Sequence, residues 1–194
     1  MQTDPTQLRE GVRKAYSAAA QSPEGKHPFP VGRDFAESVG YPPELLDRFS
    51  SEATGAFAGV SNVAISADIP PGSVVMDLGC GAGLDTLVAA ERTGPGGRVL
   101  GIDFSPTMVA RARAATADIE AVEIIEAAGE RIPLERGSVD VALVNGIFNL
   151  NPNRESLFSE LARVVRPGGV VFAAELILRA ALDAASRSSS SWFA

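Results

Sequence analysis

The chain has 194 residues, of which 45% are hydrophobic, and this suits a single globular domain with its own core. The net charge of −7, with no run of Lys or Arg, argues against a nucleic-acid partner. No apolar stretch approaches the length of a membrane span and no signal-peptide pattern is present, so we expect a cytoplasmic protein with no membrane contact. The single cysteine, Cys80, excludes an internal disulfide and a cysteine-clustered metal site.

The first third of the chain predicts helices joined by loops. Asp4-Pro5 is a typical helix start, and apolar residues at helical spacing follow it. Residues 21–32 are rich in Pro, Gly and polar side chains and predict a loop, and a short helix is expected after Pro42-Pro43. Residues 55–62 are expected to be irregular. We interpret residues 1–69 as a helical cap or lid segment.

From residue 70 onward, the pattern alternates between strand and helix, which is typical of a parallel sheet covered on both faces. Gly and Pro clusters separate the elements, and Ser105 with Pro106 is a strong helix start. Residues 70–194 are therefore expected to form one α/β domain. The expected strands are 74–77, 98–103, 122–126, 138–144 and 170–175, and the expected helices are 85–92, one from 106 and one from 153.

The first predicted strand runs into three glycines at every second position, Gly79, Gly81 and Gly83. Glycine permits a positive φ and lets a ligand lie directly against the main chain. The spacing is not the G-x-G-x-x-G of dinucleotide sites, and the preceding Asp77 suits a cationic or hydroxyl-rich ligand better than a phosphate. The pattern alone leaves two interpretations open, a nucleotide-type pocket and a simple tight turn.

Asp103 ends the second predicted strand about 20 residues past the glycines, where Rossmann-type folds place the acid that binds ribose hydroxyls. A carboxylate accepts hydrogen bonds from both hydroxyls of a ribose. The alternative is an acid favoured by the dipole of the following helix. Because the glycines and Asp103 belong to adjacent turns, we favour ribose binding.

These segments resemble the cofactor site of class I S-adenosylmethionine-dependent methyltransferases. The resemblance implies a Rossmann-like, doubly wound and mostly parallel α/β sheet, with S-adenosylmethionine as cofactor. That cofactor is a sulfonium with a ribose and no phosphate, which agrees with acids around the glycines. The matching segments, in the family's order, are Asp77-Leu78-Gly79-Cys80-Gly81-Ala82-Gly83, Gly101-Ile102-Asp103-Phe104-Ser105-Pro106-Thr107-Met108, Ile132-Pro133-Leu134 with Ser138-Val139-Asp140, and Arg163-Val164-Val165-Arg166-Pro167-Gly168-Gly169.

Within this superfamily the chain is similar to the arsenite-methyltransferase-like branch. Members of that branch carry cysteines that hold trivalent arsenic, whereas this chain has Val39, Val60 and Gly146 in the corresponding segments. Arsenite is therefore not expected as the acceptor. The segments that carry the similarity are Val39-Gly40-Tyr41-Pro42, Phe57-Ala58-Gly59-Val60-Ser61-Asn62 and Val144-Asn145-Gly146-Ile147-Phe148-Asn149-Leu150-Asn151.

The resemblance also implies a role for individual residues. Ala128 stands where many relatives place an acid for the adenine amino group, and only Glu130 is near it. No residue is predicted as a general base or as a metal ligand. The expected cofactor residues are Asp77, Gly79, Cys80, Gly81 and Gly83 beside the methionine part, Asp103 at the ribose, and Phe104, Met108, Gly129 and Glu130 around the adenine. Tyr16 is expected over the cofactor, and the alternative for it is ordinary core packing of its helix. Asn145 and Asn149 are expected near the acceptor, and the alternative for both is turn formation or helix capping.

The leading hypothesis is methyl transfer to a small-molecule acceptor. An alternative is a cofactor-binding module or inactive homologue that needs a partner chain, and a nicotinamide-dependent oxidoreductase is disfavoured by the glycine spacing and by Asp77. The family fold closes with two further strands, and nothing after Ile177 predicts either one. We therefore expect the fifth strand to be an exposed edge that forms a homo-oligomer, either through that edge or through the aromatic tail of Trp192 and Phe193.

Overall fold

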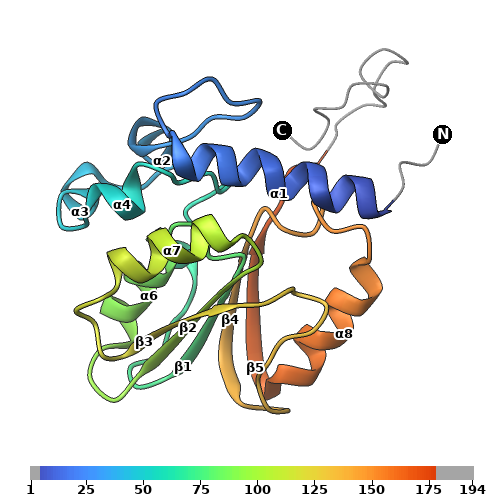
Figure 1. Ribbon diagram of the computed structural model, residues 1–194. Helices are drawn as coiled ribbons and strands as arrows, with labels where there is room; N and C mark the ends of the chain where they lie inside the picture. The colour runs from blue at the N-terminus through green and yellow to red at the C-terminus, as the bar shows by residue number, and fades with distance from the viewer. Residues whose placement is uncertain (1–4, 178–194) are drawn as a thin grey trace.

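The computed structural model describes residues 5–177 of the chain (Figure 1). Its centre is a parallel five-stranded sheet in the order β3-β2-β1-β4-β5, so that β1 and β4 lie in the middle. Helices α6 and α7 cover one face and α8 covers the other (Figure 1), which confirms the predicted doubly wound α/β architecture. The strands are β1 (Val74–Leu78), β2 (Arg98–Asp103), β3 (Val122–Glu126), β4 (Val139–Asn145) and β5 (Val165–Ala174), and the helices are α6 (Leu84–Thr93), α7 (Pro106–Ala115) and α8 (Arg154–Val164).

The two sides of the sheet form separate hydrophobic clusters because side chains alternate along each strand. Val75 of β1 packs with Leu84 and Val88 of α6. Its neighbours Met76 and Leu78 face the opposite way and pack with Leu157 and Leu161 of α8, so the central strand is buried on both faces. The same alternation turns the side chain of Asp77 toward the α6 side.

Five helices precede the sheet, and α1 lies across its upper end in Figure 1. Ser17 of α1 and Ser105, the residue before α7, place their hydroxyl oxygens 3.0 Å apart. Arg111 of α7 donates a 2.5 Å hydrogen bond to the carbonyl of Ala20. The N-terminal segment is therefore fastened directly to the helix that follows β2. Its helices are α1 (Pro5–Gln21), α2 (Arg33–Ser38), α3 (Pro43–Leu46), α4 (Ser51–Thr54) and α5 (Val63–Ser66).

The structure corrects the expected elements in two places. Helices α2, α4 and α5 were not predicted, because four to six residues are too few to show helical periodicity. The fifth strand begins at Val165 rather than Val170. Val139 pairs with Val165 and Val141 with Val170, so the Pro-Gly-Gly segment between them is accommodated as an irregularity within the strand.

β5 lies at the edge of the sheet among the described residues, as expected from the sequence. Val170 and Val171 are 47% and 40% exposed, and Phe158 on the neighbouring helix α8 is 52% exposed. The aromatic tail of Trp192 and Phe193 falls outside the described residues. No helix between residues 5 and 177 is both long and apolar enough to cross a bilayer.

Candidate functional site

The surroundings of the three glycines after β1 differ, and each explains in its own way why a glycine stands there. Gly79 gives room to Ile147, because the side chain of Ile147 occupies the place where a Cβ would be. Gly83 has φ +94° at the start of α6 and lets Ala112 of α7 approach to 3.4 Å of a Cβ position. Gly81 differs from both, since only the sulfur of Met108, at 4.0 Å, lies near its Cβ position. The face of Gly81 is therefore the part of the turn that a ligand can approach.

Asp103, at the carboxyl end of β2, faces the same turn. Its Oδ2 accepts a 3.0 Å hydrogen bond from the N–H of Gly81, and its Oδ1 accepts one of 2.8 Å from the N–H of Ser105. Burial raises the pKa of Asp103, and these backbone donors oppose the rise by stabilising the carboxylate. Two fixed donors leave further lone pairs on both oxygens for hydroxyl groups of a ligand.

Asp77 lies beneath the turn rather than beside the ligand. Its side chain is 1% exposed and accepts a 2.6 Å hydrogen bond from the hydroxyl of Thr86 in α6. Burial, and next the charge of nearby Asp85, raise the pKa of Asp77 to about 8. Asp77 therefore does not line the cavity as predicted from the sequence, because strand alternation directs it to the α6 face.

Asp85 is the centre of a buried hydrogen-bond network that joins three parts of the chain. Its Oδ1 accepts from the hydroxyl of Tyr41 and, at 3.2 Å, from the N–H of Ala64, both in the N-terminal segment. Its Oδ2 accepts a 2.8 Å hydrogen bond from the side-chain amide of Asn145, at the end of β4. Burial raises the pKa of Asp85, and the three donors oppose that rise.

Asn145 uses its whole side-chain amide within the protein. Its oxygen accepts from the N–H groups of Val60 and Ser61, at 2.8 and 3.2 Å. Its nitrogen donates to Asp85 and, at 2.7 Å, to the carbonyl of Ser61. Both donors and both acceptor positions are occupied, so Asn145 shapes the 57–62 loop and has no free group to orient an acceptor.

A cavity opens at the carboxyl ends of β1, β2 and β4, and it encloses about 1060 Å³ when its solvent-exposed part is counted. Asp85, Asp103 and Glu130 give its wall three carboxylates, and Arg9 is the cation among the described lining residues. Among residues 5–177, no group of three or more His, Cys, Asp and Glu side chains is arranged to hold a metal. The lining includes Arg9, Tyr16, Phe57, Gly59, Gly79, Cys80, Gly81, Asp85, Asp103, Phe104, Met108, Gly129, Glu130, Asn145, Ile147 and Leu150.

Helix α1 closes the side of the cavity above Phe104. Arg9 forms an ion pair with Glu130 at 3.2 Å, and its guanidinium lies 6.0 Å from the centre of the Phe104 ring. Tyr16, about two turns further along the same face of α1, stacks on Phe29 with ring centres 4.5 Å apart. Burial, and then the charges of Asp103 and Glu175, raise the pKa of Tyr16, so its hydroxyl keeps its proton.

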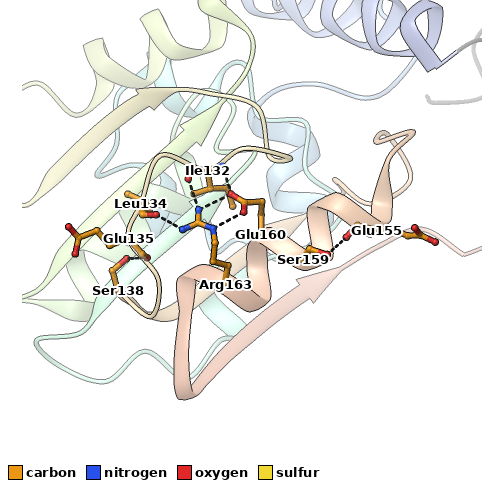
Figure 2. Close-up of polar contacts among 8 residues, drawn as sticks. All are labelled: Ile132, Leu134, Glu135, Ser138, Glu155, Ser159, Glu160 and Arg163. Carbon is orange, nitrogen blue, oxygen red and sulfur yellow. Dashed lines mark hydrogen bonds and ion pairs between the residues drawn. The ribbon is translucent and has the colours of Figure 1, made fainter.

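Two side chains of α8 hold the segment with Ile132 and Leu134, as Figure 2 shows, and this segment follows Gly129 and Glu130 in the chain. Arg163 donates hydrogen bonds of 2.7 Å to the carbonyls of Ile132 and Leu134. Glu160 accepts from Arg163 at 2.6 Å and from the N–H of Ile132 at 2.8 Å. Arg163 and Glu160 form a two-residue clamp that holds the segment after β3 against α8, next to the wall of the cavity formed by Gly129 and Glu130.

Most of the residues predicted for the site meet at the cavity, and three do not. Asp77 and Gly83 lie behind the glycine turn. Asn149 faces away, since its side-chain amide donates to the carbonyl of Leu176 and accepts from Arg154. Those that line the cavity are Tyr16, Gly79, Cys80, Gly81, Asp103, Phe104, Met108, Gly129, Glu130 and Asn145.

Sequence reasoning missed the contributions of Asp85 and Arg9. The sequence pattern assigns Asp85 only to the start of a helix, although an acid two residues after the glycine turn lies at the same edge of the sheet as the ligand. No local sequence pattern indicates the role of Arg9, because its partner Glu130 is 121 residues away in the chain.

Comparison with known proteins shows which family the chain belongs to. Residues 76–173, half of the chain, match the family described as methyltransferase domain. The chain belongs to this methyltransferase family. The family segment begins in β1 and ends in β5, so it contains the glycine turn, Asp103 and the Arg163 clamp of the methyltransferase domain.

Two relatives place this methyltransferase domain within its superfamily. It is 34% identical over 192 residues to an arsenite methyltransferase of Halobacterium salinarum, covering 90% of this chain and 48% of the relative. It is also 33% identical to a demethylmenaquinone methyltransferase of Lactococcus lactis, covering 54% of this chain and 42% of the relative. The chain thus spans about half the length of the curated relatives it matches.

A solved structure supports the same placement. The crystal structure of the arsenic(III) S-adenosylmethionine methyltransferase from Chlamydomonas reinhardtii superposes with a TM-score of 0.61 at 29% identity, covering 82% of this chain and 54% of that chain. The predicted resemblance to the arsenite-methyltransferase-like branch and the predicted class I methyltransferase fold are confirmed.

Proposed function

We propose that this chain binds S-adenosylmethionine in the cavity at the carboxyl ends of β1, β2 and β4 and transfers its methyl group to a small-molecule acceptor. The observation that carries the proposal is the pairing of Asp103 with Gly81. A carboxylate held by two backbone N–H groups stands beside the part of the glycine turn that a ligand can approach. This arrangement fits a ribose lying against the main chain.

The charge of the cavity fits the same cofactor. S-adenosylmethionine carries a sulfonium and an ammonium group, and Asp85, Asp103 and Glu130 favour cations at this wall. A dinucleotide would bring a pyrophosphate, which needs an open helix N-terminus. At the start of α6, Gly83 is packed against Ala112 and the first turn carries Asp85, so this helix end disfavours a phosphate.

Individual residues would hold separate parts of the cofactor. Asp103 would bind the ribose, Gly81 would lie under the methionine part, and Phe104 and Met108 would pack against the adenine. The loop with Gly129 and Glu130 would border the adenine, in place of an acid at Ala128. Cys80 belongs to the same turn, and burial raises the pKa of its thiol well above the usual range.

When bound, the cofactor supplies an electrophilic methyl group on a positively charged sulfur. The chain's task is then to position the acceptor and to exclude water, and such orientation contributes about 7–11 kcal/mol to lowering a barrier. Helix α1 closes one side through Arg9 and Tyr16, and the 57–62 loop closes the other through its hydrogen bonds to Asn145. Both closing segments belong to the N-terminal part of the chain.

Thermal shift and calorimetry test this proposal. S-adenosylmethionine and S-adenosylhomocysteine should both raise the melting temperature and NAD should not, because a ligand stabilises only the state that binds it. A shift with NAD and none with S-adenosylhomocysteine would overturn the assignment. Arsenite is not supported as the acceptor, since a single thiol at position 80 cannot supply a set of soft ligands.

The second candidate is a cofactor-binding module that acts with a second copy of the chain. The exposed edge of β5 favours it, because residues 167–174 contain no charge and so two such edges do not repel each other. We propose pairing of β5 with the β5 strand of a second copy around a twofold axis, which would make the contact self-complementary.

A further inference from the structure

The half of the cavity at the end of β4 has a wall made mainly of hydrocarbon. Phe104 and Glu130, where the adenine is proposed to bind, follow β2 and β3, and both strands lie on the other side of β1 from β4. Residues 57–59, which lie beside Asn145, supply one side of this wall and residues 146–152 supply the other. The side chains concerned are Phe57, Ala58, Ile147, Leu150 and Pro152.

Most of the polar side-chain atoms that border this wall already have hydrogen-bond partners within the protein. Asn145 uses all four of its hydrogen-bonding positions within the protein, and both oxygens of Asp85 accept hydrogen bonds. The side-chain oxygen of Asn151 accepts a 2.7 Å hydrogen bond from the N–H of Asn153. An acceptor molecule in this half therefore meets carbon atoms, and a polar or charged body would lose its hydration without compensation.

The titratable groups of the described lining also leave no base for an acceptor. Glu130 is paired with Arg9 at the opposite end, and Asp103 is assigned to the ribose. Asp85 is engaged with Tyr41, Ala64 and Asn145. Burial raises the pKa of both Tyr16 and Cys80, so these groups stay protonated. A nucleophile that becomes reactive without a base from residues 5–177 therefore suits this site.

We propose that the methyl acceptor is an apolar thiol, a small molecule that joins a sulfhydryl group to a hydrocarbon body. This inference rests on the proposed function. A thiol has a pKa near ~8.5, so a few per cent is thiolate at neutral pH and that thiolate is strongly nucleophilic. An alcohol or a phenol has no such fraction and needs a base. The hydrocarbon body gains free energy from burial against the wall at residues 57–59 and 146–152.

The transfer balances without a further reactant. The thiol loses its proton to water, and the electron pair of the thiolate sulfur forms a bond to the methyl carbon. The bond between that carbon and the sulfonium sulfur breaks, and its two electrons stay on that sulfur. The products are a methyl thioether and S-adenosylhomocysteine.

The first test measures binding rather than turnover. With the full chain saturated with S-adenosylhomocysteine, calorimetry compares thioanisole with S-methylcysteine, two methyl thioethers that differ in their apolar and charged bodies. Thioanisole should bind at least about tenfold more tightly. Equal affinities would overturn the inference, whereas failure of S-adenosylhomocysteine itself to bind would overturn the proposed function.

A matched pair of variants locates this binding. Leu150→Asp puts a carboxylate into the hydrocarbon wall and should weaken thioanisole binding about tenfold or more, with S-adenosylhomocysteine still bound. Leu176→Asp makes the same change at a side chain that is 65% exposed and outside the cavity lining, and it should leave both ligands unaffected. Leu150→Met conserves volume and should retain thioanisole binding. Unchanged thioanisole binding in Leu150→Asp would overturn the inference.

The second test concerns the nucleophile. Thiophenol, benzyl mercaptan and phenol are compared by the release of S-adenosylhomocysteine across a range of pH. Both thiols should be methylated and phenol should not, and the midpoint of each pH profile should follow the pKa of the thiol itself. The inference would be overturned if phenol were methylated or if neither thiol were methylated. It would also be overturned if both thiols shared one midpoint, because a shared midpoint would indicate a base on the protein.

Discussion

The backbone N–H of Gly81 donates a 3.0 Å hydrogen bond to Asp103, so the turn after β1 and the acid that ends β2 form one unit. Gly81 follows β1 and Asp103 ends β2, and these two strands are adjacent and pair in parallel from Val74 with Arg98 to Leu78 with Ile102. The main chain that would lie under the cofactor and the carboxylate that would bind its ribose are therefore positioned by the same contact.

Replacing Asp103 should weaken cofactor binding. Asp103→Ala removes a charged acceptor and also frees the turn at Gly81, so the affinity for S-adenosylhomocysteine should fall by about 1.5–3 kcal/mol, tenfold or more. Asp103→Asn keeps an acceptor oxygen without the charge and should show an intermediate loss. Calorimetry measures both, and an unchanged affinity in Asp103→Ala would show that the ribose binds elsewhere.

The raised pKa of Asp77 predicts a pH-dependent stability. The folded protein holds the proton of Asp77 up to about pH 8, whereas the unfolded chain releases it near pH ~4. The folded state thus binds more protons between these values, and the free energy of unfolding should fall as pH rises through this window, by at most about 1.4 kcal/mol per pH unit. Asp77→Asn should flatten this dependence and raise stability at pH 8. Urea unfolding at several pH values checks it, and parallel curves for both proteins would contradict it.

Removing the amide of Asn145 should loosen the N-terminal segment. Asn145→Ala leaves the N–H groups of Val60 and Ser61 without their acceptor and Asp85 without one donor. Each unsatisfied buried group costs about 1–3 kcal/mol, so the melting temperature should drop clearly. Asn149→Ala is the control, since its amide donates to an exposed carbonyl outside the cavity. Equal effects of the two variants would refute the role given to Asn145.

The clamp on α8 should depend on the planar shape of the Arg163 side chain. Arg163→Lys keeps the charge but cannot reach two carbonyls and Glu160 together, so stability should fall by about 1–3 kcal/mol. Arg98→Lys alters an ion pair whose side chains are 59% and 51% exposed, and it should cost under about 1 kcal/mol. Denaturant unfolding compares the two variants, and a loss no larger in Arg163→Lys than in Arg98→Lys would refute the clamp.

A charge on the outer strand should prevent self-association. Val171→Lys places an ammonium group on the exposed part of β5, where a second strand would otherwise pair. Ala110→Lys, on the exposed side of α7, changes the net charge equally without touching that strand. Sedimentation velocity should show association in the parent chain and in Ala110→Lys but not in Val171→Lys. A parent chain that stays monomeric at high concentration contradicts the pairing.

The strand–helix alternation was predictable because each element carries its own local signal. Ser105 accepts a hydrogen bond from the N–H of Met108, and Asn153 accepts one from Ser156, so both predicted helix starts have a capping side chain. β2 and β3 have the bounds expected from the sequence. These features depend on residues at most a few positions apart.

The parts of the site that were not predicted depend on distant partners. Tyr41 and Asp85 are 44 residues apart, and no local pattern links them. The placement of Asp77 is different, because the alternation of side chains along β1 already puts it on the same face as Val75, toward α6. The alternation of side chains along a strand therefore predicts that Asp77 does not contact the ligand.

The position of α1 has a consequence for the order of folding. This helix is the first described element of the chain, and apart from the stacking of Tyr16 on Phe29, the contacts described above join it to Ser105, α7 and Glu130, which follow it by about 90 to 120 residues. Contacts of such long sequence separation form only after the intervening chain has been closed into a loop, and that closure costs entropy. The sheet should therefore assemble first and α1 should dock onto it last. In a time-resolved hydrogen-exchange experiment, the amides of α1 should gain protection after those of β1 and β2.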